Sequence, residues 1–209
     1  MKKTLYPILI LAAVLYFAAC GTETQNTAAE TTTEASATEA AFDTAQYKKQ
    51  GMEIAMSTFG VLSGQLKSAM QEGGVPNAAQ YCNTVAYPLV DSLSEVYSAH
   101  IRRASNKVRN PKDKPTALEQ EILDTYHAQM AEGTQPKPIV RQLASGEIAF
   151  YAPIRMQELC LKCHGKLGET LKEEDYAVIK ELYPEDEAIG YEAGDLRGIW
   201  SITFEDKGK

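Results

Sequence analysis

The chain has 209 residues, of which 44% are hydrophobic and 23% charged, so it is long enough to bury a core of its own. Its formal net charge is −7, which argues against a nucleic-acid-binding protein because phosphate binding needs clustered Lys and Arg side chains. The same charge disfavours adhesion to an anionic membrane surface by electrostatics alone.

The first 19 residues have the pattern of an export signal. A short basic start, Met1-Lys2-Lys3, precedes an apolar run from Leu5 to Phe17, which is shorter than the roughly 20 apolar residues of a membrane-spanning helix. The following Ala18-Ala19-Cys20 resembles a bacterial lipoprotein cleavage box, although Phe17 stands where Leu is usual. We therefore expect a signal peptide over residues 1–19 and a lipid on Cys20, with an uncleaved anchor or an ordinary signal peptide as alternatives.

Residues 20–43 are rich in Thr, Ala and Glu and contain almost no large apolar side chain. Such a segment cannot bury enough surface to offset its ordering entropy. We expect a disordered tether that holds a folded domain, residues 44–209, at a membrane. The predicted location is the bacterial cell envelope, facing the periplasm or the cell exterior.

Helical patterns dominate the first half of the domain. From about Ala45 apolar residues recur three and four apart, and this stripe ends at residues 72–77, "EGGVPN". A second helix is predicted over residues 82–96, with a kink at Pro88. A third runs over residues 118–130, after the capping-box spacing of Thr116 and Glu119.

Strand patterns dominate the second half. A short strand is predicted at residues 100–104, a hairpin at 139–143 and 148–154, and a closing strand at 198–204, with a helix at 172–183 before it. Helices followed by strands favour an α+β fold, with a small antiparallel sheet packed against N-terminal helices.

Cys160, Cys163 and His164 form a C-x-x-C-H motif, which is typical of c-type haem attachment. Each thiol would form a thioether with a porphyrin vinyl group, and the histidine would bind the iron. Among the alternatives, a zinc site needs a second ligand pair, a thioredoxin-like dithiol needs a βαβ unit, and a disulfide across two residues is strained. Export agrees with the haem interpretation, so we expect one covalent haem c.

A second iron ligand, if the iron has one, must come from before the motif, because no Met, His or Cys follows His164. A four-helix cytochrome with five-coordinate iron is the competing architecture. Cys82 is the one thiol left after lipidation and haem attachment, and the residues alone leave open whether it is a ligand or an inert buried cysteine. The other candidates are His100, His127, Met52, Met56, Met70, Met130 and Met156.

Four segments resemble the single-haem, c-type PAS-like domain family, which is described from cyanobacterial proteins and also found ahead of sensor kinases. They are "AAQYCNTVAYPLVDSLSE", "IRRASNKVRNPKDKPTALEQEIL", "CLKCHG" and "GIWSITF", and the resemblance covers residues 45–204. It implies a PAS-like sheet flanked by helices and a covalent haem whose iron is bound by His164 and Cys82. The family has Ala-Pro after the cysteine, whereas this chain has Ala86-Tyr87-Pro88.

The only dense basic cluster also bears on the haem. Arg102, Arg103, Lys107 and Arg109 lie close together in an otherwise acidic body, and Arg suits carboxylates. We expect one or two of them, Arg102 and Arg103 first, to pair with the haem propionates, although a solvated charged strand would look the same.

The sequence therefore predicts a membrane-tethered monohaem cytochrome that is not an enzyme and acts as a redox sensor or an electron-transfer protein. A thiolate ligand stabilises ferric iron, so the potential should be low. Sensing would need a separate partner protein, which the sequence does not identify. The alternatives are a reduced-state sensor of CO or NO and a haem enzyme of the peroxidase or nitrogen-oxide type.

Overall fold

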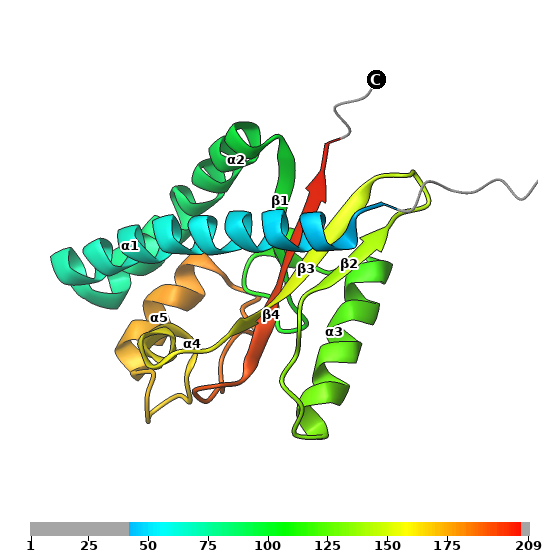
Figure 1. Cartoon of the computed structure of the whole chain (residues 1–209). Helices are drawn as coiled ribbons and strands as arrows, with labels where there is room; N and C mark the ends of the chain where they lie inside the picture. The colour runs from blue at the N-terminus through cyan, green and yellow to red at the C-terminus, as the bar shows by residue number, and fades with distance from the viewer. Residues whose placement is uncertain (1–41, 206–209) are drawn as a thin grey trace, which may run out of the picture. The chain divides into compact units, whose positions relative to one another are not determined.

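The computed structural model describes residues 42–205, which belong to one compact unit (Figure 1). The predicted signal peptide, Cys20 and nearly all of the tether lie outside the described residues. In chain order the elements are α1 (Thr44–Thr84), α2 (Ala86–Tyr97), β1 (Ala99–Ala104), η1 (Pro111–Asp113), α3 (Ala117–Ala131), β2 (Ile139–Gln142), β3 (Ile148–Arg155), η2 (Glu158–Cys160), α4 (Leu161–His164), α5 (Glu173–Leu182) and β4 (Leu196–Phe204).

Helix α1 begins where Asp43 accepts hydrogen bonds from the backbone N–H groups of Ala45 and Gln46. The expected break at residues 72–77 is a kink and not a loop, because the chain re-enters a helix directly after Gly73 and Gly74. Gly74 has φ +67° and ψ −158°, a conformation that residues with a Cβ atom avoid.

The boundary between the first two helices also differs from the prediction. Cys82 lies in the last turn of α1, and the chain leaves the helix at Val85. Pro88 falls in the first turn of α2, and the kink expected from it is the break at Val85, because in a continuous helix the ring of Pro88 would clash with the carbonyl group four residues earlier, at Thr84, where α1 ends.

The four strands form one antiparallel sheet in the order β1-β4-β3-β2. The predicted hairpin is β2 and β3, and the predicted closing strand is β4, which lies at the centre with Ile202 opposite both Ile101 and Phe150. An irregularity at Ile154 and Arg155 shifts the register where β3 leaves the sheet.

Helices cover both faces of the sheet, and Figure 1 shows α1 crossing over the strands. On one face, Ile54 of α1 and Val90 of α2 pack with Phe150 and Trp200. The other face packs on α3, with these buried residues in contact: Ala104, Ile122, Leu123, Tyr126, Ala149, Tyr151, Leu196 and Ile199. The predicted α+β fold, a small antiparallel sheet packed against N-terminal helices, is confirmed.

The part of α1 after the kink packs away from the sheet. Val75 and Ala79 meet Ile179 and Tyr183 at α5, and Cys163 lies against the same cluster. The kink therefore directs the end of α1, with Cys82, towards the segment that holds the C-x-x-C-H motif. Within residues 42–205, no helix combines the length and apolarity that crossing a membrane requires.

Candidate functional site

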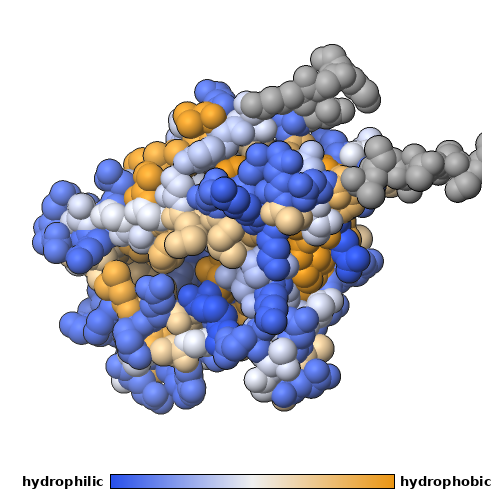
Figure 2. Space-filling model, in the orientation of Figure 1, coloured by the Kyte–Doolittle hydropathy of each residue, from blue (hydrophilic) through white to orange (hydrophobic). Residues whose placement is uncertain are grey.

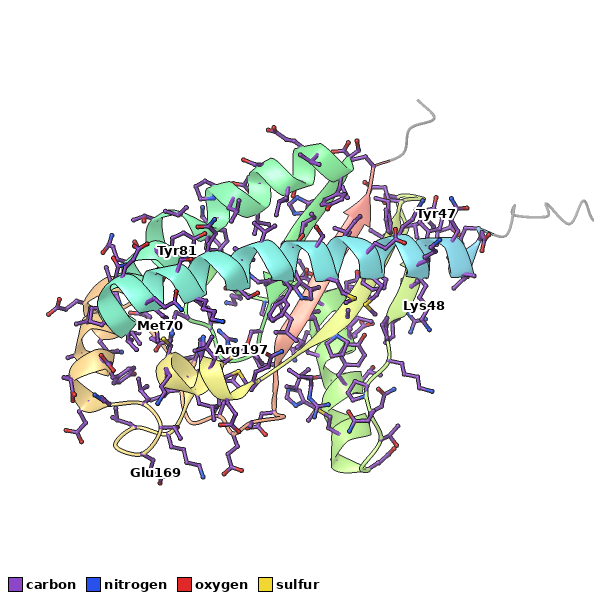
Figure 3. All side chains as sticks on the ribbon, turned by 60° about the vertical axis from the view of Figure 1, so that its left-hand side comes forward. Tyr47, Lys48, Met70, Tyr81, Glu169 and Arg197 are labelled. Atoms are coloured by element: carbon purple, nitrogen blue, oxygen red, sulfur yellow. The ribbon has the colours of Figure 1, made fainter. Side chains whose placement is uncertain are left out.

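A largely apolar cavity of about 230 Å³ lies where α1 and α2 meet the end of the sheet. Cys82, Cys160, Cys163 and His164 all line it, so the fold brings the early cysteine to the late motif. Figure 3 labels three further lining residues, Met70 and Tyr81 from α1 and Arg197 from β4.

The motif follows directly from β3. The backbone N–H of Met156 donates to the carbonyl of Asp195 at 2.9 Å, which ties the end of β3 to the start of β4. The chain then turns through η2 and α4 and ends the short helix at Gly165. A Cβ atom on Gly165 would overlap the side chain of Thr170 and the carbonyl of Leu161, so a glycine is needed directly after the motif.

One ring nitrogen of His164 is engaged in a hydrogen bond with the backbone. Its Nδ1 lies 2.7 Å from the carbonyl oxygen of Ala188, and since a carbonyl can only accept, Nδ1 holds the proton. Nε2 is then the nitrogen with a free lone pair. Burial holds the pKa of His164 well below its usual value, and the nearby Arg109 and Arg197 lower it further. A neutral imidazole of this tautomer is the form that binds a metal ion through Nε2.

Two thiols in the cavity are held in their protonated form. Burial raises the pKa of Cys163 to about 12, although Arg109 opposes the shift. Burial also raises the pKa of Cys82, opposed by Arg103 and Arg109. All three described cysteines are free, so the motif is not closed by a disulfide.

The two adjacent arginines of the predicted pair lie in different surroundings. Arg103 lines the cavity with its guanidinium over the ring of Tyr87. Arg102 is not a lining residue: its Nη1 lies 3.1 Å from a carboxylate oxygen of Glu119, and its Nη2 donates to two carbonyl groups near η1. Arg102 thus ties β1 to η1 and α3, and we do not assign it to the cavity.

Arg197 is a lining residue that the sequence analysis missed. Its Nη1 donates to Ser105 Oγ at 2.5 Å and to the carbonyl of Lys107 at 3.1 Å. Burial lowers the pKa of Arg197. Arg197 lies far from the basic cluster in sequence and reaches it only because β4 pairs with β1. The only sequence feature that could have pointed to Arg197 is its position directly before the predicted closing strand, residues 198–204.

The lining of the cavity includes some of the other predicted iron ligands and excludes the rest. His100 and His127 are exposed and do not line it, and neither do Met52, Met56 and Met130. Met70 and Met156 do. Met156 is only a few residues before Cys160, too close in sequence to reach the opposite side of a bound haem. Cys82 and Met70, which line the cavity from α1, are therefore the remaining sulfur-bearing candidates.

One residue of the cavity lining, Tyr81, carries a buried hydroxyl. Tyr81 Oη is inaccessible to solvent and has no hydrogen-bond partner among the described residues. Such a group is costly to bury without a partner. Among residues 42–205, no group of three or more His, Cys, Asp or Glu side chains is placed to hold a bare metal ion.

The fold and the site define an α+β domain in which thiols, a neutral imidazole and arginines face an apolar cavity. A family model described as Tll0287-like matches residues 22–204, and the chain belongs to that family. It is also similar to a solved structure described as the crystal structure of the cyanobacterial heme-protein Tll0287, with 21% sequence identity and a TM-score of 0.49. That match covers 74% of this chain and 97% of the other. No curated protein matches the chain.

Proposed function

We propose that this protein is a cytochrome-like haem protein with one covalent haem c. Cys160 and Cys163 would form the thioethers, and His164 would bind the iron through Nε2. The observation that carries the proposal is the His164 tautomer, which leaves Nε2 free beside both motif cysteines. The description of Tll0287, whose name the family bears, as a haem protein agrees with it.

The cavity walls suit a haem. Their surface is mainly apolar, as a porphyrin requires, and the two motif thiols are free to react. Arg103 and Arg197 are the arginines we propose for the propionates, since the Arg109 guanidinium is already held by Asp186 and two carbonyl groups. When bound, the haem would supply a one-electron redox centre.

We propose Cys82 as the second iron ligand. It lines the same cavity as His164, and although burial raises the pKa of the free thiol, iron binding would displace its proton. A thiolate ligand donates electron density and stabilises ferric iron, so the reduction potential should be low. Met70, a neutral thioether, would give a higher potential, which makes the two candidates distinguishable.

In the cell, we propose a lipid anchor on Cys20 at the bacterial envelope and a role in redox sensing or electron transfer without catalytic turnover. The motif and the signal-like N-terminus support this compartment because covalent haem attachment takes place outside the bacterial cytoplasm. A separate redox partner protein would receive the electron or the signal.

Binding of CO or NO to the reduced protein is a second candidate function, favoured by the apolar cavity that Cys82 and His164 both line. Reduction of a bound haem would add negative charge next to a Cys82 thiolate and would weaken its bond to iron. Absence of CO binding by the reduced protein would exclude this function and leave electron transfer.

The test compares optical and EPR spectra of the wild type, Cys82→Ser and Met70→Leu, each expressed with haem-maturation machinery. We expect a low-spin thiolate spectrum in the wild type and Met70→Leu, and its loss in Cys82→Ser. An unchanged Cys82→Ser spectrum with an altered Met70→Leu spectrum would transfer the ligand role to Met70. Intact mass must show one haem added to the wild type and none to a Cys160→Ala, Cys163→Ala variant.

A further inference from the structure

We propose that the buried ion pair of Arg109 and Asp186 is a positioning device for His164. It fixes the carbonyl group that holds the imidazole, and so sets the orientation and tautomer of the iron ligand. This inference rests on the proposed function, in which His164 binds the iron. Neither residue touches the imidazole through its own side-chain hydrogen bonds, so both act through the backbone of Ala188.

The ion pair has the geometry of a two-pronged clamp. Arg109 Nε donates to Asp186 Oδ1 at 3.0 Å, and Arg109 Nη2 donates to Oδ2 at 2.9 Å. The Asp186 side chain is 0% exposed and that of Arg109 is 11% exposed. A fork of this kind restricts both side chains to one arrangement.

The ion pair fixes the His164 ring through two hydrogen bonds in series. Asp186 Oδ1 also accepts a hydrogen bond of 3.0 Å from the backbone N–H of Ala188, which fixes the peptide group at that residue. The carbonyl of the same residue then accepts from His164 Nδ1 at 2.7 Å. In metal-binding histidines, the group that accepts a hydrogen bond from the ring nitrogen not bound to the metal fixes the ring orientation and raises the basicity of the ring.

Arg109 also acts on the motif directly. Its Nη2 donates to the carbonyl of Cys163 at 2.7 Å and approaches the carbonyl of Ala188 at 3.3 Å. The backbone N–H of Tyr191 closes the arrangement by donating to the carbonyl of His164 at 3.0 Å. One guanidinium therefore bridges the motif to the loop between α5 and β4.

A buried ion pair is weak support for stability, because well-packed apolar residues can replace it without loss. Here the pair does something that apolar residues cannot, since it orients a backbone carbonyl with charge-assisted hydrogen bonds. The Asp186 carboxylate also offsets part of the positive charge that Arg109 places beside the ligand. Loss of Asp186 would leave the Arg109 cation uncompensated near His164.

The test uses the haem-loaded protein with Asp186→Ala and the near-isosteric Asp186→Asn. Asp195→Ala is the matched control, because Asp195 Oδ2 accepts from the backbone N–H of Glu192 in the same loop but has no bond to Ala188. NMR of the ferric protein measures how fast the Nδ1 proton of His164 exchanges with solvent, and EPR reports the ring orientation. We expect exchange about tenfold faster and shifted g values in Asp186→Ala. Asp186→Asn, whose amide oxygen can still accept from Ala188 although the ion pair is lost, should lie between wild type and Asp186→Ala in exchange.

Exchange and g values in Asp186→Ala that match those of Asp195→Ala would overturn the proposal. If Asp186→Ala does not fold, Arg109→Lys is the deciding variant, because a lysine cannot form two parallel hydrogen bonds to Asp186. Unchanged exchange of the His164 Nδ1 proton in Arg109→Lys would also refute the proposal. Failure of the proposed function would look different: the wild type itself would then lack a histidine-bound iron spectrum.

Discussion

Gly51 of α1 lies against the ring of Phe150 in β3, so close that a Cβ atom on Gly51 would overlap the ring. Phe150 is fully buried, and Ile54 from the next turn of α1 joins the same core cluster. The missing side chain at Gly51 is thus what lets the first half of α1 reach the sheet.

Gly51→Ala should lower the free energy of unfolding by about 3 kcal/mol, because the buried ring cannot move aside. Gly60→Ala is the control in the same helix: a Cβ atom there meets nothing within 4 Å, and the change should raise the free energy of unfolding by about 0.5–1 kcal/mol. Urea denaturation of both variants measures the difference. Equal effects would mean that α1 does not dock closely on Phe150.

Gly74→Ala should straighten or strain the kink of α1. The conformation of Gly74 costs a residue with a Cβ atom about 1–3 kcal/mol, so the variant should be less stable by that amount. Gly64→Ala, in open space on the same helix, should show no loss. Since the kink aims Cys82 at the cavity, we also expect Gly74→Ala to alter the EPR spectrum of the haem-loaded protein, and Gly64→Ala to leave it unchanged.

Arg197→Gln should lower the reduction potential of the haem protein. It removes a cation from the cavity wall, and the loss of positive charge favours the ferric state. Arg102→Gln should instead leave the potential unchanged and reduce stability by about 3 kcal/mol, because Glu119 loses its partner in a buried position. If Arg197 and not Arg102 lines the haem site, redox titration should show a shifted potential only in Arg197→Gln, and urea denaturation should show the stability loss from the broken Glu119 ion pair only in Arg102→Gln. A potential shift in Arg102→Gln alone would return Arg102 to the site.

The protein should lose stability as the pH rises from 10 to 12. Burial raises the pKa of Tyr151 to about 12, so the unfolded chain releases this proton at a lower pH than the folded protein does. The stability linked to Tyr151 is therefore complete below pH 10 and falls as the pH rises towards 12. Tyr151→Phe should reduce this loss by on the order of 2 kcal/mol, as measured by urea denaturation at pH 8 and pH 11.5. Identical pH profiles for the variant and the wild type would contradict this.

Local patterns predicted most of the fold. The 3.6-residue period gave helices α1 and α3, and alternation gave the hairpin and β4, because these signals depend only on neighbours in the chain. The region 72–77 was expected to break the helical pattern, since Gly-Gly and Pro usually end helices, and the backbone does leave the helical conformation at Gly73 and Gly74. Packing of Val75 and Ala79 on α5 limits this break to a kink.

The site was less predictable because its parts are spatial neighbours only. The motif residues and Cys82 have chemistry that can be recognised one residue at a time. Arg197 and Asp186 have no such signal, since their roles depend on how β4 and the loop before it fold back. Arg102 and Arg103 were treated alike, yet neighbouring strand residues point to opposite faces, so only one of them could face the cavity.

The kink of α1 has a consequence for the unfolded chain. It brings Cys82 to a cavity that Cys160, roughly 80 residues later in the chain, also lines, and a group bonded to both residues would be a cross-link. By the loop-closure relation used for disulfides, a cross-link over such a loop restricts the denatured ensemble by about 4 kcal/mol. A ligand bond that breaks on reduction would release that restriction, so the stability of the protein would change with its oxidation state.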